Sequence, residues 1–431
     1  MIRKVLFLVL LAITSCKSFT EMSSPKNLIV SEGAQVIFNL PDCLPQCKAS
    51  DQVELAANSK VEAAYVDAIK NAKKSVNFSQ FTFSRKPIFD ALIAAASRGV
   101  VVKGIVDRSQ LKTTGAFCQP SGCTLPVPYS EAEYISAPIA SRIGRLQNEA
   151  MYKNGSMSDR LVLLLTYLPN NAGVKTAPGK ERLVHNKFAI VDESKLLTGS
   201  GNWSSTAVSV NLENLTRFES LVFPDVLKAY NCMFTVVWEG DPDIIAKRLP
   251  ACQVPGQVYF SPSGLGNLTP HRAISEAISG TRSKIDVAMH HLVDPEISRS
   301  LIEAHQRGVK VRIAVDDDDC NDLNSRSVIG DLEKIGVQVR YLPTTCSIFQ
   351  LSHSKYGVFD GTYVINGSGN WSKSGLGRNY ENFFISKELS GKFSDHFEWM
   401  WSRAVERSVC QCDRTEPECV KRFCLDMVPN N

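Results

Sequence analysis

The sequence has little net charge, no long apolar runs and none of several common catalytic signatures. Its 48 Lys and Arg residues nearly balance its 44 Asp and Glu residues, so the formal net charge is only +4 and no strong basic field indicates a nucleic acid partner. Apart from a short run at the amino terminus, no apolar stretch approaches the roughly 20 residues of a membrane-spanning helix. Because no P-loop, dinucleotide-binding motif or H-E-x-x-H sequence occurs, nucleotide-dependent and zinc-protease activities have no support. The remaining composition, 44% hydrophobic and 21% charged over 431 residues, is that of a large globular protein.

The amino terminus has the pattern of a secretory signal. Arg3 and Lys4 precede the apolar run 5–13, which is too short to span a bilayer as a helix. The next residues, I-T-S-C, end at Cys16 and resemble the lipobox of bacterial lipoproteins, and Lys17 resembles the signal for sorting to the outer membrane. We therefore expect an exported, periplasm-facing lipoprotein that is anchored through Cys16 in the outer membrane of a Gram-negative bacterium. Ordinary signal-peptidase cleavage nearby is the alternative.

The chain has 13 cysteines, an odd number for an exported protein. If Cys16 carries a lipid, twelve remain, and an even number is typical of a disulfide framework. The last four cysteines, between Cys410 and Cys424, could instead bind zinc, although their spacing is not that of a usual zinc finger. Close spacing favours local bridges in four pairs: Cys43/Cys47, Cys118/Cys123, Cys232/Cys252 and Cys320/Cys346.

An internal repeat organises the chain. At an offset of 209 residues, Ser75–Asp107 aligns with Lys284–Asp316 without a gap. Each copy predicts a helix (61–72 or 270–280), a strand (76–83 or 285–292), a second helix, and a β-branched strand that ends in aspartate. The duplicated β-α-β unit predicts an α/β protein of two lobes, each with a mainly parallel mixed sheet flanked by helices.

The repeat also sets the expected domain boundaries. Two copies of a polar motif lie 168 residues apart, so the first half contains 41 additional residues, which fall within about 111–180. An insertion at the carboxyl end of a strand is either a lid or substrate wall, or a tolerated surface loop. We expect five segments: the signal peptide and lipobox (1–16), a linker with Cys43 and Cys47 (17–60), lobe 1 (61–245), lobe 2 (246–405) and a cysteine-rich tail (406–431).

The polar motif reads H-x-K-x4-D-x6-G-S-x-N, with a glutamate eleven residues after the asparagine. Residues i and i+2 of a strand project from the same face, so His and Lys converge on one point. A histidine, a cation and an amide donor in each half are suited to bind a phosphate oxyanion. The motif residues are His185, Lys187, Asp192, Ser200, Asn202 and Glu213 in the first half, and His353, Lys355, Asp360, Ser368, Asn370 and Glu381 in the second.

This duplicated motif closely resembles the signature of the phospholipase D superfamily, and the resemblance covers approximately residues 60–400. The extension G-S-x-N-W-S resembles the branch of bacterial endonucleases and mitochondrial cardiolipin-hydrolase-like proteins. The resemblance implies two lobes related by a pseudo-twofold axis and packed as one catalytic unit. It also implies a two-step exchange at a phosphodiester that needs no metal and no cofactor.

The resemblance further implies a role for each motif residue. His185 would attack phosphorus and form a covalent phosphohistidine while His353 acts as acid and base, with the exchanged assignment as the alternative. Each glutamate, Glu213 or Glu381, would fix the tautomer of the histidine 28 residues before it, unless it is an exposed loop acid. The remaining roles are phosphate binding by Lys187, Lys355, Asn202 and Asn370, assistance by Ser200 and Ser368, and orientation of strands and turns by Asp192 and Asp360.

Three functions remain open. Phospholipid hydrolysis is favoured by the predicted acyl anchor and the low charge, and a nuclease is favoured by the W-S extension of the motif. A non-catalytic envelope-binding protein is disfavoured because every motif position is intact in both halves. We expect a monomer that acts on phospholipid, with nucleic acid as the alternative substrate. His290 and His291, at a strand end of the second repeat, either line the pocket or are ordinary strand-end residues.

Overall fold

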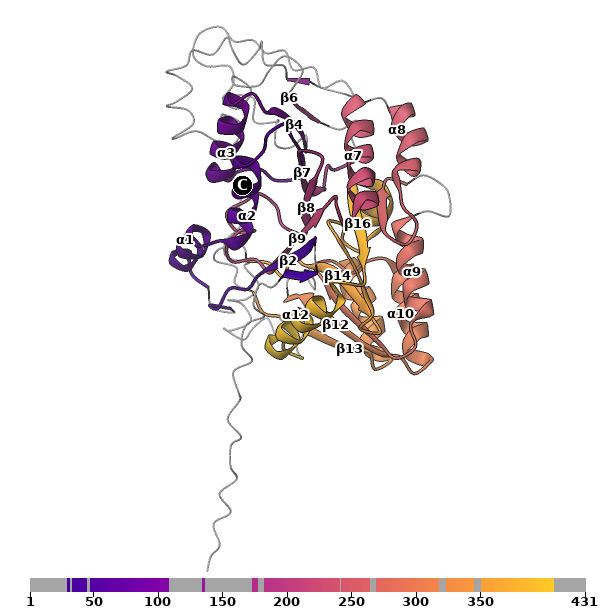
Figure 1. Ribbon diagram of the computed structural model, residues 1–431. Helices are drawn as coiled ribbons and strands as arrows, with labels where there is room; N and C mark the ends of the chain where they lie inside the picture. The colour runs from indigo at the N-terminus through magenta and orange to yellow at the C-terminus, as the bar shows by residue number, and fades with distance from the viewer. Residues whose placement is uncertain are drawn as a thin grey trace, which may run out of the picture.

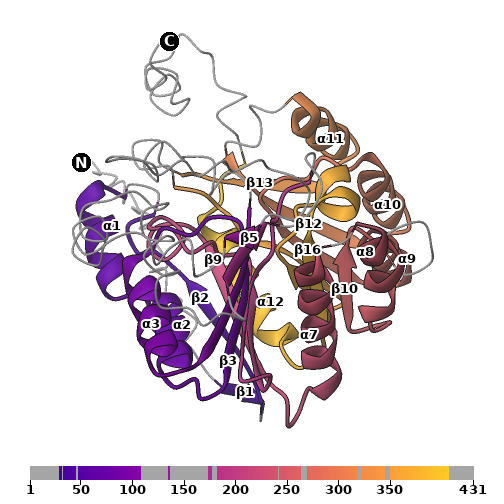
Figure 2. The same cartoon turned by 90° about the horizontal axis from the view of Figure 1, so that it is seen from above.

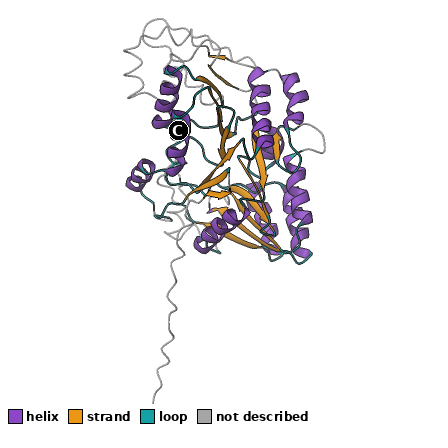
Figure 3. Cartoon of the chain, viewed as in Figure 1, coloured by secondary structure: helices purple, strands orange, loops and turns teal. Residues whose placement is uncertain are grey.

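The computed structural model consists of two β-sheets with helices packed on their outer faces (Figure 1, Figure 3). No helix among the described residues is long and apolar enough to cross a membrane. The predicted signal peptide, Cys16 and the tail from residue 407 lie outside those residues. The structure describes residues 29–31, 33–44, 47–107, 134–135, 173–176, 182–240, 242–263, 269–317, 323–344 and 350–406.

The first sheet has the strand order β1-β2-β9-β8-β7-β3-β4-β6-β5. Helices α2 (Lys60–Lys70) and α3 (Lys86–Ser97) pack on it through an apolar cluster that includes Ile69, Leu92 and Phe78. Helix α1 (Ala49–Ala57) precedes them. The strands are β1 (Ile29–Ser31), β2 (Ala34–Asn39), β3 (Ser75–Gln80), β4 (Val101–Val106), β5 (Tyr134–Ile135), β6 (Gly173–Thr176), β7 (Lys187–Val191), β8 (Lys195–Gly199) and β9 (Glu213–Glu219).

The second sheet has the strand order β10-β16-β15-β14-β11-β12-β13. Its outer face is covered by α9 (Pro270–Gly280), α10 (Pro295–Gln306) and α11 (Leu323–Lys334). Two short helices, η3 (Leu249–Cys252) and η6 (Ser374–Arg378), lie in connections. The strands are β10 (Val258–Ser261), β11 (Lys284–Met289), β12 (Lys310–Asp316), β13 (Gln338–Leu342), β14 (Lys355–Phe359), β15 (Tyr363–Gly367) and β16 (Glu381–Ser386).

The two sheets share the same order over six strands, because β9-β8-β7-β3-β4-β6 corresponds to β16-β15-β14-β11-β12-β13. The prediction of a duplicated α/β protein with two mixed sheets is therefore confirmed. The expectation that each sheet is mainly parallel is wrong, since only β3, β4 and β6, and likewise β11, β12 and β13, pair in parallel. The motif strands β7, β8 and β9 form an antiparallel meander, and so do β14, β15 and β16.

Part of the expected linker 17–60 belongs to the first sheet, which corrects that boundary for the described residues. Strand β2 pairs antiparallel with β9, in the position that β10 has beside β16 in the second lobe. The expected insertion 111–180 contains β6, which pairs with β4 as β13 pairs with β12. Apart from β5 and β6, that insertion lies outside the described residues.

The two lobes share one apolar core. Helices α7 (Pro224–Glu239) and α12 (Ser390–Arg403) contribute to it together with strands of both sheets, and α8 (Pro242–Arg248) follows α7. Figure 2 shows α2 and α3 on one side of the molecule, α9 and α10 on the other, and both sheets between them. Across the core, the ring of Phe218 lies 5.1 Å from that of Phe384, and Tyr230 lies 5.2 Å from Phe260.

Buried hydrogen bonds also join the lobes, and they obey the pseudo-twofold relation. Asn366 Nδ2 donates to Asn214 Oδ1 at 2.7 Å, and Asn382 Nδ2 donates to Thr198 Oγ1 at 2.9 Å. Thr198 and Asn366 occupy equivalent positions in the two motifs, as do Asn214 and Asn382. Removing one partner of such a pair while the lobes stay packed would leave the other amide buried and unsatisfied, a cost of about 1–3 kcal/mol for each group.

Two of the four expected disulfide pairs, Cys43–Cys47 and Cys232–Cys252, are bonded. The second bridge fixes the end of η3 to α7 beside the shared core. Cys118/Cys123, Cys320/Cys346 and the four cysteines from Cys410 onward lie outside the described residues.

Candidate active site

The two motif histidines are held by the backbone of the opposite lobe. The N–H of His185 donates to the carbonyl of Tyr380 at 3.0 Å, and the N–H of His353 donates to the carbonyl of Leu212 at 3.0 Å. Each histidine lies two residues before the start of the first strand of a meander, β7 or β14. Tyr380 and Leu212 each precede the motif glutamate, so the chain segment that carries each glutamate lies beside the histidine of the other lobe.

The glutamates contact the histidines across the lobe interface. His185 Nδ1 lies 2.7 Å from Glu381 Oε1, and His353 Nδ1 lies 2.8 Å from Glu213 Oε1. The prediction that each glutamate serves the histidine of its own half is therefore wrong, because the parallel bridges between the lobes exchange the partners. A carboxylate at Nδ1 holds the proton on that atom and leaves the Nε2 lone pair of a neutral imidazole for chemistry.

The motif serines support the glutamates. Ser200 Oγ donates to Glu213 Oε2 at 2.6 Å and accepts from the backbone N–H of Asn214 at 2.9 Å. Ser368 makes the equivalent bonds to Glu381 at 2.6 Å and from Asn382 at 3.0 Å. The expected role of Ser200 and Ser368 in phosphate binding is corrected accordingly: both hydroxyls are fully buried and already engaged in positioning a carboxylate.

The motif lysines are buried beside the histidines. Lys187 Nζ donates to the carbonyl of His185 at 2.6 Å, and Lys355 Nζ contacts the carbonyl of His353. Burial lowers the pKa of Lys187 to about 8, although the carboxylates of Glu381 and Glu213 oppose the shift. Burial likewise lowers the pKa of Lys355 well below its usual value. Two buried ammonium groups with few fixed partners provide a site that an anionic phosphate would complete.

Burial also shifts the pKa values of the histidines and of one glutamate. It lowers the pKa of His185, although the charge of Glu381 opposes this shift. It lowers the pKa of His353 further, because the charges of Lys355 and Lys187 act in the same direction as burial. Burial raises the pKa of Glu213 to about 7, although Lys355 and the Ser200 hydroxyl oppose the shift. Both imidazoles are thus predominantly neutral before an anion binds, which is the form that attacks as a nucleophile.

Asn202 and Asn370 are half-buried at the glycine turns that follow β8 and β15. Their Oδ1 atoms have no hydrogen-bond partner within the described residues, so both carboxamides retain capacity to bind a ligand. The glycines that end β8 and β15, Gly199 and Gly367, allow these strands to approach β9 and β16 closely. A Cβ atom at Gly199 would lie 2.1 Å from the carbonyl oxygen of Asn214, and one at Gly367 would lie 2.0 Å from that of Asn382.

Asp192 and Asp360 are distant from this chemistry, as their expected role in orienting turns requires. Asp192 accepts the backbone N–H groups of residues 73–75 at 2.7–3.1 Å, and Asp360 accepts those of residues 282–284 at 2.8–3.0 Å. Partial burial would raise the pKa of both carboxyl groups, but the hydrogen bonds outweigh it. The backbone bonds lower the pKa of Asp192, and the backbone bonds together with the Ser283 hydroxyl lower the pKa of Asp360 to about 2. The two carboxylates fasten the start of β3 and of β11 to the meanders.

Two further aspartates were not assigned a role from the sequence. Asp107 accepts the N–H of Val184 at 2.9 Å, and Asp316 accepts the N–H of Ser352, so each fixes the residue immediately before a motif histidine. The charge of Asp107 also acts on Lys187. The signal for this function was present, because both aspartates recur at the end of the internal repeat.

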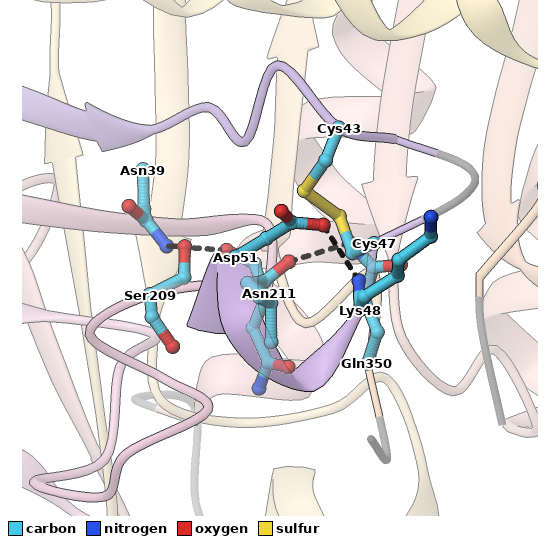
Figure 4. The surroundings of a disulfide bond; sticks show 9 residues. Asn39, Cys43, Cys47, Lys48, Asp51, Ser209, Asn211 and Gln350 are labelled. Carbon is cyan, nitrogen blue, oxygen red and sulfur yellow. Dashed lines mark hydrogen bonds between the residues drawn. A yellow bond between two sulfur atoms is a disulfide. The ribbon is translucent and has the colours of Figure 1, made fainter. Parts of the chain in front are cut away.

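The Cys43–Cys47 bridge lies near the supports of Glu213 (Figure 4). Gln350 Nε2 donates to the carbonyl of Val210 at 2.8 Å and lies 3.2 Å from Cys47 Sγ. Asn211 joins the same region, since its Oδ1 accepts the N–H of Leu351 at 3.0 Å and its Nδ2 lies 3.4 Å from Glu213 Oε1. The bridge thus borders the segment that places the carboxylate beside His353.

Comparison with known proteins agrees with this arrangement. Residues 65–238 and 274–401 match the family model described as "Cardiolipin synthase, PLD-like domain". The mitochondrial cardiolipin hydrolase of Mus musculus is 33% identical over 156 residues, which cover 35% of this chain and 67% of that protein. The human protein of the same name is 33% identical over 129 residues, which cover 30% of this chain and 49% of that protein. The chain therefore spans between half and two thirds of the length of these relatives.

Among solved structures, the phosphatidylserine synthase of Haemophilus influenzae has the same overall fold. Its TM-score is 0.54 at 12% identity, and the match covers 85% of this chain and 91% of that one. At such identity the likeness concerns the fold alone. The family model covers well over half of the chain and includes both motifs. The chain therefore belongs to the phospholipase D superfamily of phosphodiesterases.

Proposed function

We propose that this protein is a phospholipase D-like enzyme that hydrolyses phospholipid headgroup esters through a covalent phosphohistidine, without a metal. The observation that carries the proposal is the pair of crossed imidazole–carboxylate contacts, 2.7 Å at His185 and 2.8 Å at His353. Each contact holds the proton of its histidine on Nδ1 and leaves Nε2 available for chemistry. Lys187 and Lys355 place positive charge beside both histidines. One nucleophile, one acid and an anion site are the groups that a two-step phosphoryl exchange requires.

In the first step, His185 Nε2 attacks phosphorus and the bond from phosphorus to the leaving oxygen breaks. His353, protonated at Nε2 once the anionic substrate is bound, gives that proton to the departing alcohol. The nonbridging oxygens lie against Lys187, Lys355 and the carboxamides of Asn202 and Asn370. The charge of the substrate offsets the two ammonium groups that otherwise hold the pKa of His353 low.

In the second step, neutral His353 removes a proton from water as the water oxygen attacks phosphorus. The bond from phosphorus to His185 Nε2 breaks, the phosphate monoester leaves, and His353 is again protonated. Glu381 and Glu213 keep both rings oriented throughout because they accept from Nδ1. A single chain supplies both histidines, so we propose that the enzyme works as a monomer.

Phospholipid is the proposed substrate class for three reasons. The relatives that match are named cardiolipin hydrolase, and the chain has little net charge to attract a polyanion. Apolar groups also border the site: the ring of Phe81 lies 5.0 Å from that of His185, and Leu183 is 42% exposed two residues before His185. Export and an acyl anchor at Cys16 are part of the proposal, since they would hold the enzyme at a lipid surface.

The test is a substrate comparison with the purified chain in the presence of a chelator. Vesicles of phosphatidylcholine, phosphatidylethanolamine or cardiolipin are compared with single- and double-stranded DNA. We expect headgroup or phosphatidate release from at least one lipid and none from the His353→Asn variant. Cleavage of DNA alone would replace the lipid assignment by the nuclease alternative, and turnover of no diester would overturn the enzymatic proposal. Intact mass of the membrane-extracted protein tests the anchor, since an unmodified chain from Met1 would exclude it.

A further inference from the structure

The active site departs from its pseudo-twofold symmetry at the strand ends beside the catalytic histidines. The strand ends of β3 and β11 are equivalent in the repeat, yet the first is followed by Phe81 and the second by His290. The ring of Phe81 lies 5.0 Å from that of His185, and the ring of His290 lies 4.9 Å from that of His353. Each catalytic imidazole thus has an aromatic neighbour from its own lobe, but only His353 has one that can form hydrogen bonds.

His290 is placed to interact with a small polar molecule. Its backbone is fixed by a 3.0 Å bond from its N–H to the carbonyl of Ser354, and its ring contacts that of His291 at 3.9 Å. Its Nδ1 atom is buried and has no hydrogen-bond partner in the part of the chain that the structure describes. Burial, together with the charges of His291, Lys355, His353 and His185, lowers its pKa well below the usual value, so the ring is neutral. A neutral imidazole both donates and accepts hydrogen bonds, and a buried polar atom without a partner is costly.

We propose that His290 is the positioning residue for the water molecule that His353 activates in the second step. The inference rests on the proposed two-histidine mechanism and adds to it a physical difference between the two halves. Beside His185, the Phe81 ring offers no site to a water molecule, which suits a nucleophile that must remain free to attack phosphorus. Beside His353, the His290 imidazole holds a water molecule for deprotonation. The Phe81/His290 difference therefore assigns attack to His185 and acid–base chemistry to His353.

The test separates the two steps with bis(p-nitrophenyl) phosphate, a soluble diester whose leaving group needs little protonation. The His290→Phe variant places in the second lobe the side chain that the first lobe has, so its packing has a precedent in the same site. We expect the initial burst of p-nitrophenolate to keep its rate within about threefold, while steady-state turnover falls by about tenfold or more because the intermediate is hydrolysed slowly. The His290→Gln variant, which retains hydrogen-bonding groups, should recover part of the turnover.

Phe81→Leu serves as the matched control, because it changes the aromatic neighbour of the other histidine without changing any polar group. It should not selectively slow the steady-state phase. Equal loss of burst and turnover in His290→Phe, or no change in either, would overturn the role of His290 while leaving the two-histidine mechanism intact. A wild-type enzyme that turns over this diester with no burst and no covalent adduct would overturn the mechanism and this inference with it.

Discussion

Glu381 and His185 belong to different lobes, yet the carboxylate Oε1 of the first lies 2.7 Å from the imidazole Nδ1 of the second. The reciprocal pair, Glu213 and His353, has a separation of 2.8 Å. Each half of the duplicated unit therefore supplies a histidine that only the other half can orient. The site is complete only when the lobes are packed together, and buried amide hydrogen bonds also join the lobes at this interface.

Exchange of each glutamate for glutamine should affect the histidine of the opposite lobe. Glu381→Gln should change the ¹⁵N shifts and tautomer of His185, and Glu213→Gln those of His353. Both should lower kcat by about 10²–10⁴-fold with a small change in KM, because an orienting carboxylate acts mainly in the transition state. Histidine-labelled NMR spectra check the pairing, and it fails if Glu381→Gln perturbs His353 and leaves His185 unchanged.

Asp360 should contribute to stability and not to chemistry. Asp360→Asn removes the charge that accepts three backbone N–H groups and the Ser283 hydroxyl, so the free energy of unfolding should fall by about 1–2 kcal/mol. The value of kcat should stay within about threefold, because the carboxylate touches none of the groups around the phosphate site. Urea denaturation and steady-state kinetics measure the two effects. Loss of activity at unchanged stability would show that this aspartate acts on the substrate.

The glycine before the motif serine should tolerate no side chain. In Gly367→Ala the new Cβ would meet the Asn382 carbonyl at 2.0 Å, so β15 and β16 must separate and the free energy of unfolding should fall by about 2 kcal/mol or more. Gly330→Ala is the matched control, since it lies in helix α11 with nothing within 4 Å of the added atom. That substitution should be neutral or stabilise by up to about 1 kcal/mol. Similar losses in the two variants would contradict the close approach.

A buried histidine outside the site should make the fold sensitive to acid. His396 stacks on Phe38 at 4.0 Å and shares a 2.8 Å hydrogen bond with Tyr356, and burial lowers its pKa to about 3. Below its ordinary pKa of about 6.5, the unfolded chain binds a proton that the folded chain does not, so stability is full above that pH and falls as the pH drops toward 3. Between the two pKa values, one such group lowers the free energy of unfolding by about 1.4 kcal/mol for each pH unit.

The His396→Phe variant, which keeps an aromatic ring, should show a shallower loss of stability between pH 6.5 and pH 4 than the wild type in chemical denaturation. A wild-type curve with the same slope as the variant would mean that His396 takes up its proton equally well in the folded and unfolded chains.

The sequence was sufficient for the duplication, the two mixed sheets and the motif residues, because repeats and strand periodicity are local signals. It was not sufficient for the pairing of the strands. The β-α-β unit predicted parallel sheets, but the strands of the meander from Lys187 to Glu219 pair antiparallel with one another and with β3 and β2. The direction of the first two strands depends on the short turn at Asp192. Strand β2 was missed because a short segment before the repeat carries no motif of its own.

The site, like the fold, could be predicted from the sequence only in part. The constant spacing from His185 to Glu213 identified the participants, but partner choice depends on how the lobes dock, and no pattern within one half records that. The roles of Ser200 and Ser368 were misassigned for a related reason. The sequence does not show whether a serine hydroxyl in this motif faces a phosphate oxygen or a carboxylate oxygen of the protein. The Phe81/His290 difference was visible in the repeat, and only the ring contacts gave it a meaning.

The most direct measurement of the central claim is the location of the covalent adduct. The enzyme is mixed with bis(p-nitrophenyl) phosphate and quenched in alkali, where a phosphohistidine survives, and its peptides are then analysed by mass spectrometry. The two-lobe mechanism predicts a p-nitrophenyl phosphoryl group on His185 in the wild type, more of it in His290→Phe, and none in His185→Asn. A stable adduct on His353, or continued turnover by His185→Asn without any adduct, would contradict it.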